Sequence, residues 1–161
     1  MANDVIYYKS PIGTVKIAGS VDGIQSLVFI EEPAETSKNI PKFLKPCLQQ
    51  LQEYFNGNRK DFDLKLHPKG TDFQISVWEE LKRIPYGKTR SYMEQTKALG
   101  NLKAIRAVAS ANGKNPISII IPCHRVIGSD GSLTGYAGGI WRKKWLLEHE
   151  NPSHQTSLFK F

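Results

Sequence analysis

The chain changes its pattern around residues 67–70, and this change restricts the folds that it can adopt. Before that point, β-rich runs at residues 5–8, 14–18 and 24–30 are separated by turn sequences that contain Pro, Gly and Asp. After it, short amphipathic segments begin with helix-capping residues and end near glycine or proline. A chain with its strands first and its helices afterwards is predicted to have an α+β fold.

The first half is expected to form a β-meander followed by a loop and one helix. Residues 31–38 have the polar composition of a loop, and apolar residues at helical spacing predict a helix over about 41–55. Cys47 lies in the apolar stripe of that helix. It is therefore predicted to be a core thiol.

Two capping boxes mark helix starts in the second half. Thr71 with Gln74 opens one helix, and Ser91 with Glu94 opens another, which should end at Gly100. In each pair the first side chain accepts from a free backbone N–H of the first turn, and the second reaches back to the cap. These segments are therefore expected to be short, well-defined helices.

A third helix, over about 102–112, completes a helix-turn-helix pattern with the helix before it. Lys103, Arg106 and Ser110 are spaced three and four residues apart, so they should share an exposed face that contacts DNA. The residues expected to pack inward are Ala104, Ile105, Val108 and Ala111. Such helices can also pack as a simple hairpin, but the basic charge nearby favours DNA binding.

The whole chain has a net charge of +7, and the positive charge is concentrated in its second half. Between Lys82 and Lys114 there are eight Lys or Arg residues and one acid, Glu94. A local excess of this kind favours a polyanionic partner, although a solvated basic face gives the same pattern. The connector thus separates two predicted domains of different character, 1–68 and 69–161.

Several protein classes do not fit the sequence. No apolar run approaches the length that spans a membrane, and residues 1–4 do not begin a signal peptide, so an intracellular protein without a membrane partner is expected. Cys47 and Cys123 could form a disulfide, but an intracellular protein should keep them reduced. No spacing typical of zinc ligands occurs, so no metal site is expected.

A last helix is expected over about 139–149, near the end of the chain. Trp141 and Trp145 lie one turn apart within it. Aromatic residues at this spacing are typical of a helix face that packs on a core. Both indoles are therefore predicted to be buried.

The most informative stretch surrounds Cys123. The β-branched run 117–121 predicts a buried strand, and Pro122 ends it because proline has no N–H to donate. Cys123 then stands beside His124 and Arg125, a basic environment that favours the nucleophilic thiolate. A structural cysteine with chance basic neighbours has the same sequence. Since adjacent residues of a strand face opposite ways, a Cys–His pair needs either a backbone turn at Pro122–Cys123 or a bridging water.

The sequence Pro-Cys-His-Arg-Val at 122–126 resembles the active-site signature of the O6-alkylguanine-DNA alkyltransferases, also called methylated-DNA–protein-cysteine methyltransferases. The segments that match at the family's spacing are Arg106–Val108, Asn115–Pro116, Tyr136–Gly139 and Trp145–Glu150. The similarity is specific over about 71–150. It implies a ribonuclease H-like N-terminal domain with a small antiparallel sheet, and a winged-helix-like C-terminal domain that contains the helix-turn-helix.

The resemblance implies direct reversal of DNA damage. Cys123 would take the alkyl group from O6-alkylguanine, and from O4-alkylthymine, in a single displacement that leaves a thioether and spends the protein. His124 would deprotonate Cys123 through a water, and Glu150 would hold and polarise His124. Tyr92 would supply the proton that the departing guanine needs. The damaged base must be flipped out of the stack to reach the thiol.

Further roles follow by similarity. Arg106 would fill the space that the flipped base vacates, and Asn115 would brace the turn before the active-site strand. Tyr136 and Ala137 would line the pocket, with Ala137 standing where some relatives carry serine. The implied partner is double-stranded DNA with an alkylated guanine, and no cofactor is implied because the thiol itself is the acceptor.

The resemblance also carries expectations about the whole molecule. We expect a monomer in the cytoplasm, or in the nucleus if the source is eukaryotic. Some members of the family bind zinc through cysteines in the N-terminal domain. This chain has no cysteine before Cys47, so no such zinc site is expected.

Two other functions fit parts of the sequence. A non-catalytic module that binds lesions or regulates genes, with Cys123 as a structural residue, predicts DNA binding without covalent change. A thiol hydrolase built on Cys123 and His124 predicts many turnovers without DNA. The hydrolase leaves the basic helices unexplained.

Overall fold

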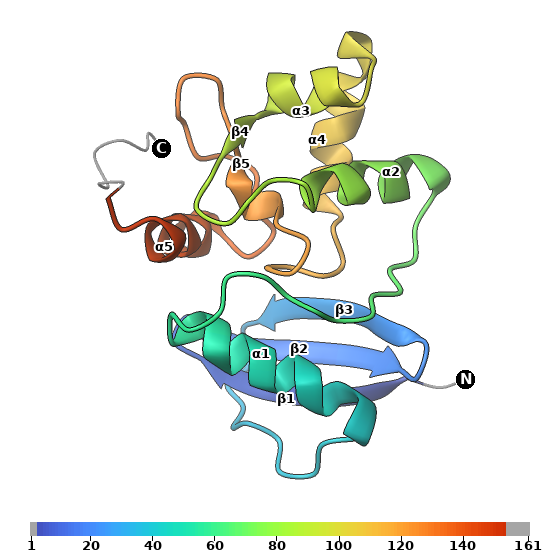
Figure 1. Cartoon of the computed structure of the whole chain (residues 1–161), viewed down its shortest axis with the longest axis vertical. Helices are drawn as coiled ribbons and strands as arrows, with labels where there is room; N and C mark the ends of the chain where they lie inside the picture. Colours follow the sequence, from blue (N-terminus) through green and yellow to red (C-terminus); the bar gives the residue numbers. More distant parts are fainter. Residues whose placement is uncertain (1–2, 154–161) are drawn as a thin grey trace. The chain divides into compact units, whose positions relative to one another are not determined.

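The computed structural model describes residues 3–153, which form two compact units. The first unit contains the described residues up to 69 together with 116–118, and the second contains 70–115 and 119–153. Strands dominate the first unit and helices the second (Figure 1). This arrangement confirms the α+β class that the sequence predicts.

The first unit is built on a three-stranded antiparallel sheet. Strands β1 (Asp4–Ser10), β2 (Gly13–Ser20) and β3 (Gly23–Ile30) pair in the order β1-β2-β3, as a meander. The two connections are tight because Gly13 and Gly23 adopt φ values of 115° and 133°, which side chains with a Cβ rarely allow. The predicted meander is therefore confirmed.

One helix packs on this sheet. A short 3-10 turn, η1 (Lys42–Leu44), leads into α1 (Lys45–Phe55), which lies across one face of the sheet (Figure 1). Cys47 and Leu51 are fully buried on the inner face of α1. The predicted helix and the predicted core position of Cys47 are both confirmed.

The segment before Cys123 is not the strand that its β-branched residues predict. Its first residues run along β3, where the Leu27 N–H donates to Pro116 (2.8 Å) and the Ser118 N–H donates to Leu27 (2.9 Å). Ile119 then adopts a φ of 71°, and the backbone turns. The predicted strand over 117–121 is wrong because this left-handed residue interrupts it, although the run is buried as expected for β-branched residues.

The second unit is mainly helical. Its helices are α2 (Asp72–Leu81), α3 (Tyr92–Ala98), α4 (Ile105–Gly113) and α5 (Ile140–Glu150). The short elements are β4 (Arg90–Ser91), the 3-10 turn η2 (Leu102–Ala104), the 3-10 turn η3 (Cys123–Arg125) and β5 (Val126–Ile127). Strands β4 and β5 form a parallel pair. Both predicted capping boxes are present, at the starts of α2 and α3.

Helices α3 and α4 form the predicted helix-turn-helix. The turn between them includes Gly100 at a φ of 91°. The buried amides of Gln95 and Asn112 exchange two hydrogen bonds, 2.8 and 2.7 Å long, and so fix the two helices together. The indole N–H of Trp78 donates to the Ala111 carbonyl (2.9 Å), which attaches α2 to the end of α4.

The faces of α4 and α5 differ in part from the sequence prediction. The inward face of α4 is formed by Val108 and Ala111, whereas Ala104 and Ile105 are only half-buried. In α5 the prediction of buried indoles is wrong, since Trp141 is 56% exposed and Trp145 is half-buried. The residues that α5 buries are Arg142, Lys143, Leu146, Leu147 and Glu150. This face meets polar groups, so charged side chains take the places expected for aromatic ones.

None of the helices in the described part of the chain is both long enough and apolar enough to cross a membrane. The longest, α1 and α5, have 11 residues each. A membrane-spanning helix needs about 20 residues that are predominantly apolar.

Candidate active site

Cys123 lies at the first position of a tight backbone turn. Pro122 has φ −84° and ψ 64°, and the Cys123 N–H donates to the Ile121 carbonyl (2.8 Å), which forms an inverse γ-turn. The Arg125 N–H then donates to the Pro122 carbonyl (3.0 Å) and closes the 3-10 turn η3. The backbone turn is therefore present, but it does not join the thiol to the imidazole, because His124 Nδ1 has no hydrogen-bond partner among residues 3–153. A bridging water is still needed between the two groups.

Cys123 is a half-buried residue, and its thiol has polar neighbours. The buried amide of Asn115 donates to its Sγ (3.3 Å) and to the Ile121 carbonyl (2.7 Å). Desolvation raises the pKa of the Cys123 thiol, while the Asn115 hydrogen bond and the positive charge of Lys143 act to lower it. The thiol is thus buried enough to resist ionisation, but its thiolate has two stabilising partners.

A buried ion-pair network follows directly in the chain. Glu150, from the last turn of α5, accepts from His124 Nε2 (2.8 Å) and from Arg125 Nε and Nη2 (2.8 and 3.0 Å). Arg125 Nη1 donates to the Ile84 carbonyl (2.7 Å). The residues Glu150, His124 and Arg125 are all at most 6% exposed. Burial acts to raise the pKa of Glu150, but His124 and Arg125 outweigh it and hold this pKa far below its usual range.

The network leaves His124 suited to act as a base. Burial lowers the pKa of His124, so the neutral ring is favoured even though Glu150 opposes this shift. An ionised carboxylate can only accept, so the neutral ring carries its proton on Nε2. The lone pair then lies on Nδ1, which is buried without a hydrogen-bond partner among residues 3–153.

The basic neighbour that acts on the thiol is not the one that the sequence indicated. Arg125 is held by Glu150 and the Ile84 carbonyl, and it does not contribute to the pKa of Cys123. The cation that does contribute is Lys143, twenty residues further along the chain. Neither adjacent basic residue, His124 or Arg125, shifts the pKa of Cys123, so the cation that favours the thiolate lies elsewhere in the chain.

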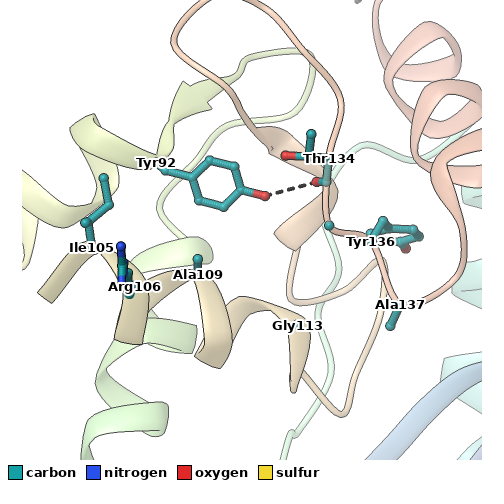
Figure 2. A pocket seen from close by; sticks show the side chains of 9 residues that line it. Tyr92, Ile105, Arg106, Ala109, Gly113, Thr134, Tyr136 and Ala137 are labelled. Atoms are coloured by element: carbon teal, nitrogen blue, oxygen red, sulfur yellow. Dashed lines mark hydrogen bonds between the residues drawn. The ribbon is translucent and has the colours of Figure 1, made fainter. Parts of the chain in front are cut away.

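An open cavity of about 610 Å³ lies between α4 and the segment 134–137 (Figure 2). Its lining residues are Tyr92, Ile105, Arg106, Ala109, Gly113, Thr134, Gly135, Tyr136 and Ala137. The Tyr92 hydroxyl points toward the opposite wall and donates to the Thr134 carbonyl (3.1 Å) (Figure 2). The small residues of α4 keep this side of the cavity open.

The candidate residues fall into three groups. Cys123, His124, Glu150 and Asn115 form the polar cluster around the η3 turn. A second group lines the cavity and consists of Tyr92, Arg106, Tyr136 and Ala137. Lys103 and Ser110 are exposed near Arg106 in sequence but do not line the cavity. The two main groups are coupled, because burial and the charge of Cys123 both raise the pKa of Tyr92.

This arrangement contains a thiol, a neutral imidazole and a carboxylate that binds the imidazole, which are the groups that a nucleophile, its base and an orienting acid require. The described residues contain no cluster of three or more His, Cys, Asp or Glu side chains that could hold a metal ion. A thiol that loses its proton to a neutral histidine can attack an electrophilic carbon directly. The geometry therefore suits transfer of a carbon group to sulfur.

Two family descriptions together cover most of the chain. Residues 72–152 match the DNA binding domain of 6-O-methylguanine DNA methyltransferase, and residues 5–68 match the ribonuclease-like domain of the same family. The chain belongs to the 6-O-methylguanine DNA methyltransferase family. The predicted family resemblance is confirmed, and the ribonuclease-like first half and the DNA-binding second half agree with the predicted fold.

Relatives in the methyltransferase family match over nearly their full length. A methylated-DNA–protein-cysteine methyltransferase of Methanosarcina barkeri is 51% identical over 93% of this chain and 97% of its own. The crystal structure of Mycobacterium tuberculosis O6-methylguanine methyltransferase has a TM-score of 0.81 at 44% identity, covering 95% of this chain and 96% of the other. A crystal structure of Mycobacterium tuberculosis OGT in complex with DNA has a TM-score of 0.82 at 46% identity, covering 94% and 95%.

Sequence reasoning missed Lys143 in this methyltransferase-family chain. It stands beside Arg142 and Lys144 in a helix that ends a basic domain, and such a run indicates a solvated face. The structure instead buries Lys143 completely. Lys143 lies two residues after Trp141, on the opposite side of α5. Its burial could therefore have been predicted only from the knowledge that Trp141 is exposed.

Proposed function

We propose that this chain repairs DNA by transferring the alkyl group of O6-alkylguanine to the sulfur of Cys123. The observation that carries the proposal is the Cys123 thiol followed by the buried His124–Glu150 pair, which leaves His124 Nδ1 as a base. A relative named methylated-DNA–protein-cysteine methyltransferase, 51% identical to this chain, supports the same reaction. No cofactor is needed, because the thiol is the acceptor.

The proposed step is one displacement at the alkyl carbon. The thiol proton passes to His124 through a water, the S–C bond forms, and the C–O6 bond breaks with its electron pair going to guanine. Tyr92 protonates the departing base. The product is a thioether, which offers water no good leaving group, so each protein molecule reacts once. Glu150 stabilises the imidazolium that forms on His124, in the manner of the orienting acid of a catalytic triad.

We assign DNA binding to the C-terminal domain, 69–161, with the N-terminal domain, 1–68, as its smaller companion. Arg106 lies on the exposed side of α4 and lines the cavity, which supports a role in filling the space left by a flipped base. Lys103 and Ser110 are exposed on the same segment, where they can contact the DNA backbone. The DNA complex of the mycobacterial relative supports a DNA partner.

The remaining assignments concern the pocket. Tyr136 and Ala137 would contact the flipped base from the wall opposite α4. Asn115 would brace the turn that carries Cys123, since it bonds both the thiol and the Ile121 carbonyl. The same displacement extends to O4-alkylthymine, whose alkyl carbon is also bound to an exocyclic ring oxygen.

We also propose that the protein acts as a monomer where the genome lies. One chain holds every group that the reaction uses, so a second copy has no chemical part in it. Its substrate is genomic DNA, which places the activity in the cytoplasm of a prokaryote or the nucleus of a eukaryote.

Intact-mass measurement tests the proposed reaction directly. The protein is mixed in equimolar amount with a duplex that contains one O6-methylguanine, and the Cys123→Ser variant serves as the control. We expect the wild type to gain one methyl group in place of the thiol proton, mapped to Cys123, and the variant to gain none. Tight binding with an unchanged mass would instead support the lesion-binding module. Repeated turnover without DNA would support the thiol hydrolase.

A further inference from the structure

Lys143 is a fully buried cation in the first turn of α5. Its Nζ donates to the Thr134 carbonyl (2.8 Å), and no carboxylate in the described part of the chain forms an ion pair with it. Burying a lysine without a carboxylate is costly, because desolvation disfavours the charged form. Burial accordingly lowers the pKa of Lys143 to about 8. The burial of Lys143 without a carboxylate partner therefore indicates that neighbouring groups use its charge or its hydrogen bonds.

The Thr134 carbonyl joins Lys143 to Tyr92. This oxygen accepts the Lys143 ammonium and also the Tyr92 hydroxyl (3.1 Å), so both of its lone pairs are used. The Lys143 Nζ lies 5.8 Å from the centre of the Tyr92 ring. Thr134 begins the segment 134–137 that forms one wall of the cavity. Lys143 thus holds the start of this wall and the tyrosine that faces it.

The same ammonium also acts on the thiol. The titratable groups that interact with Lys143 are Cys123 and His124 from the η3 turn and Tyr92 from α3. Of these, Cys123 is the group whose negative form raises the pKa of Lys143. Desolvation favours neutral Lys143, whereas the Cys123 thiolate favours its charged form. In return, the positive charge of Lys143 favours the thiolate form of Cys123.

We propose that Lys143 is a positioning residue for alkyl transfer, acting through the Thr134 carbonyl on Tyr92 and through its charge on the Cys123 thiolate. This inference rests on the proposed function and adds a residue to it. At pH 7, below its pKa of about 8, Lys143 keeps its proton, and it does not touch the lesion. It stabilises the nucleophile before transfer and holds the Tyr92 hydroxyl beside the pocket wall.

Arg142 provides a matched control for this role. It is adjacent to Lys143, it is only 6% exposed, and its Nη1 donates to the Gly138 carbonyl (2.9 Å), just beyond the same wall. Arg142 makes no contribution to the pKa of Cys123. Replacing Arg142 therefore removes an anchor of the segment without changing the charge that the thiol experiences.

The test measures the pH dependence of Cys123 alkylation by iodoacetamide in the full-length protein. We compare Lys143→Gln, which keeps a hydrogen-bond donor and loses the charge, with Lys143→Arg and Arg142→Gln. We expect Lys143→Gln to raise the midpoint by about one pH unit and to slow labelling at pH 7 about tenfold. Lys143→Arg should restore the wild-type midpoint, and Arg142→Gln should leave it unchanged.

A folded Lys143→Gln variant with the wild-type midpoint would overturn the inference, as would an equal shift in Arg142→Gln. If Lys143→Gln does not fold, Lys143→Arg decides the matter. A midpoint raised by about one pH unit despite the retained charge would then overturn the proposal, and an unchanged one would support it. Circular dichroism identifies the variants that fold.

The labelling test is independent of the proposed function because it uses no DNA. Methyl transfer from the O6-methylguanine duplex, measured in parallel, should fall about tenfold in Lys143→Gln at pH 7. A wild type that transfers a methyl group, with an unshifted midpoint in the variant, keeps the function and rejects the role of Lys143. A wild type that transfers nothing rejects the function, and the midpoint still reports on Lys143.

Discussion

The two cysteines of this chain show what separates an inert thiol from a reactive one. Both are free, and burial raises the pKa of both thiols. Cys47 lies on the inner, apolar face of α1, where nothing opposes desolvation, and its pKa rises to about 12. At Cys123 the Asn115 amide and the Lys143 charge oppose the same effect. The two thiols therefore differ in their polar partners, since desolvation acts on both of them.

Among substitutions near the two cysteines, Glu150→Gln should have the largest effect on methyl transfer by Cys123. The carboxylate that orients His124 and neutralises Arg125 is lost, so methyl transfer should slow by about 10²- to 10⁴-fold. Removing one partner of a buried ion pair should also cost about 3–5 kcal/mol of unfolding free energy. Single-turnover kinetics and urea unfolding measure the two effects. A transfer rate equal to that of the wild type would show that Cys123 does not depend on this network.

A smaller change is expected from Asn115→Ala, made in a Cys47→Ala background so that Cys123 is the sole thiol. Loss of the hydrogen bond to Sγ should raise the pKa of Cys123 and slow its labelling at pH 7 about tenfold. The buried Ile121 carbonyl also loses one of its two donors but keeps the Cys123 N–H, so the loss should cost about 0.5–1.5 kcal/mol of stability. Iodoacetamide labelling and urea unfolding provide the measurements. Unchanged labelling would remove Asn115 from the list of stabilising partners.

The smallest effect is expected from Cys47→Ala, which should change how the unfolding free energy depends on pH above pH 8. The folded state holds the Cys47 proton up to a pKa of about 12, whereas an unfolded chain releases it near 9.0. The stability linked to this proton is therefore fully present below pH 9 and is lost as the pH rises toward 12. Between pH 8 and pH 10, the wild type should lose about 1.4 kcal/mol more than the variant.

Urea unfolding of the two proteins at both pH values measures this difference directly. The variant should start about 1 kcal/mol less stable at neutral pH because of the small cavity. Methyl transfer by Cys123 should be unchanged. Parallel stability curves from pH 8 to pH 10 would mean that Cys47 is not desolvated as the structure implies.

The elements that the sequence predicts well are those set by local chemistry. In each of the two capping boxes, side-chain and backbone groups three residues apart form hydrogen bonds, so four consecutive residues are enough to identify the helix start. The alternating runs of the meander likewise depend on near neighbours. The run at 117–121 fails because its pairing partner, Leu27, is far away in sequence and because one residue, Ile119, takes an unusual backbone conformation.

The candidate site was predictable only where a motif spans its residues. Cys123 and His124 are identified by the signature, and Glu150 follows from family spacing. The partner of Arg125 could not be read from its neighbours, because the guanidinium reaches a carboxylate 25 residues away. Lys143 has no local signal, since its burial depends on which face of α5 turns inward.

Ile119 places two opposing demands on one position. Its φ of 71° suits glycine, while its side chain is almost completely buried. A left-handed backbone at a β-branched residue costs about 1–3 kcal/mol. Burying an isoleucine side chain contributes about 1.5–3 kcal/mol. Glycine would relieve the backbone but remove the side chain, and other bulky residues would keep the strain. The sequence four residues before Cys123 thus has few neutral substitutions, which restricts the routes by which this turn can evolve.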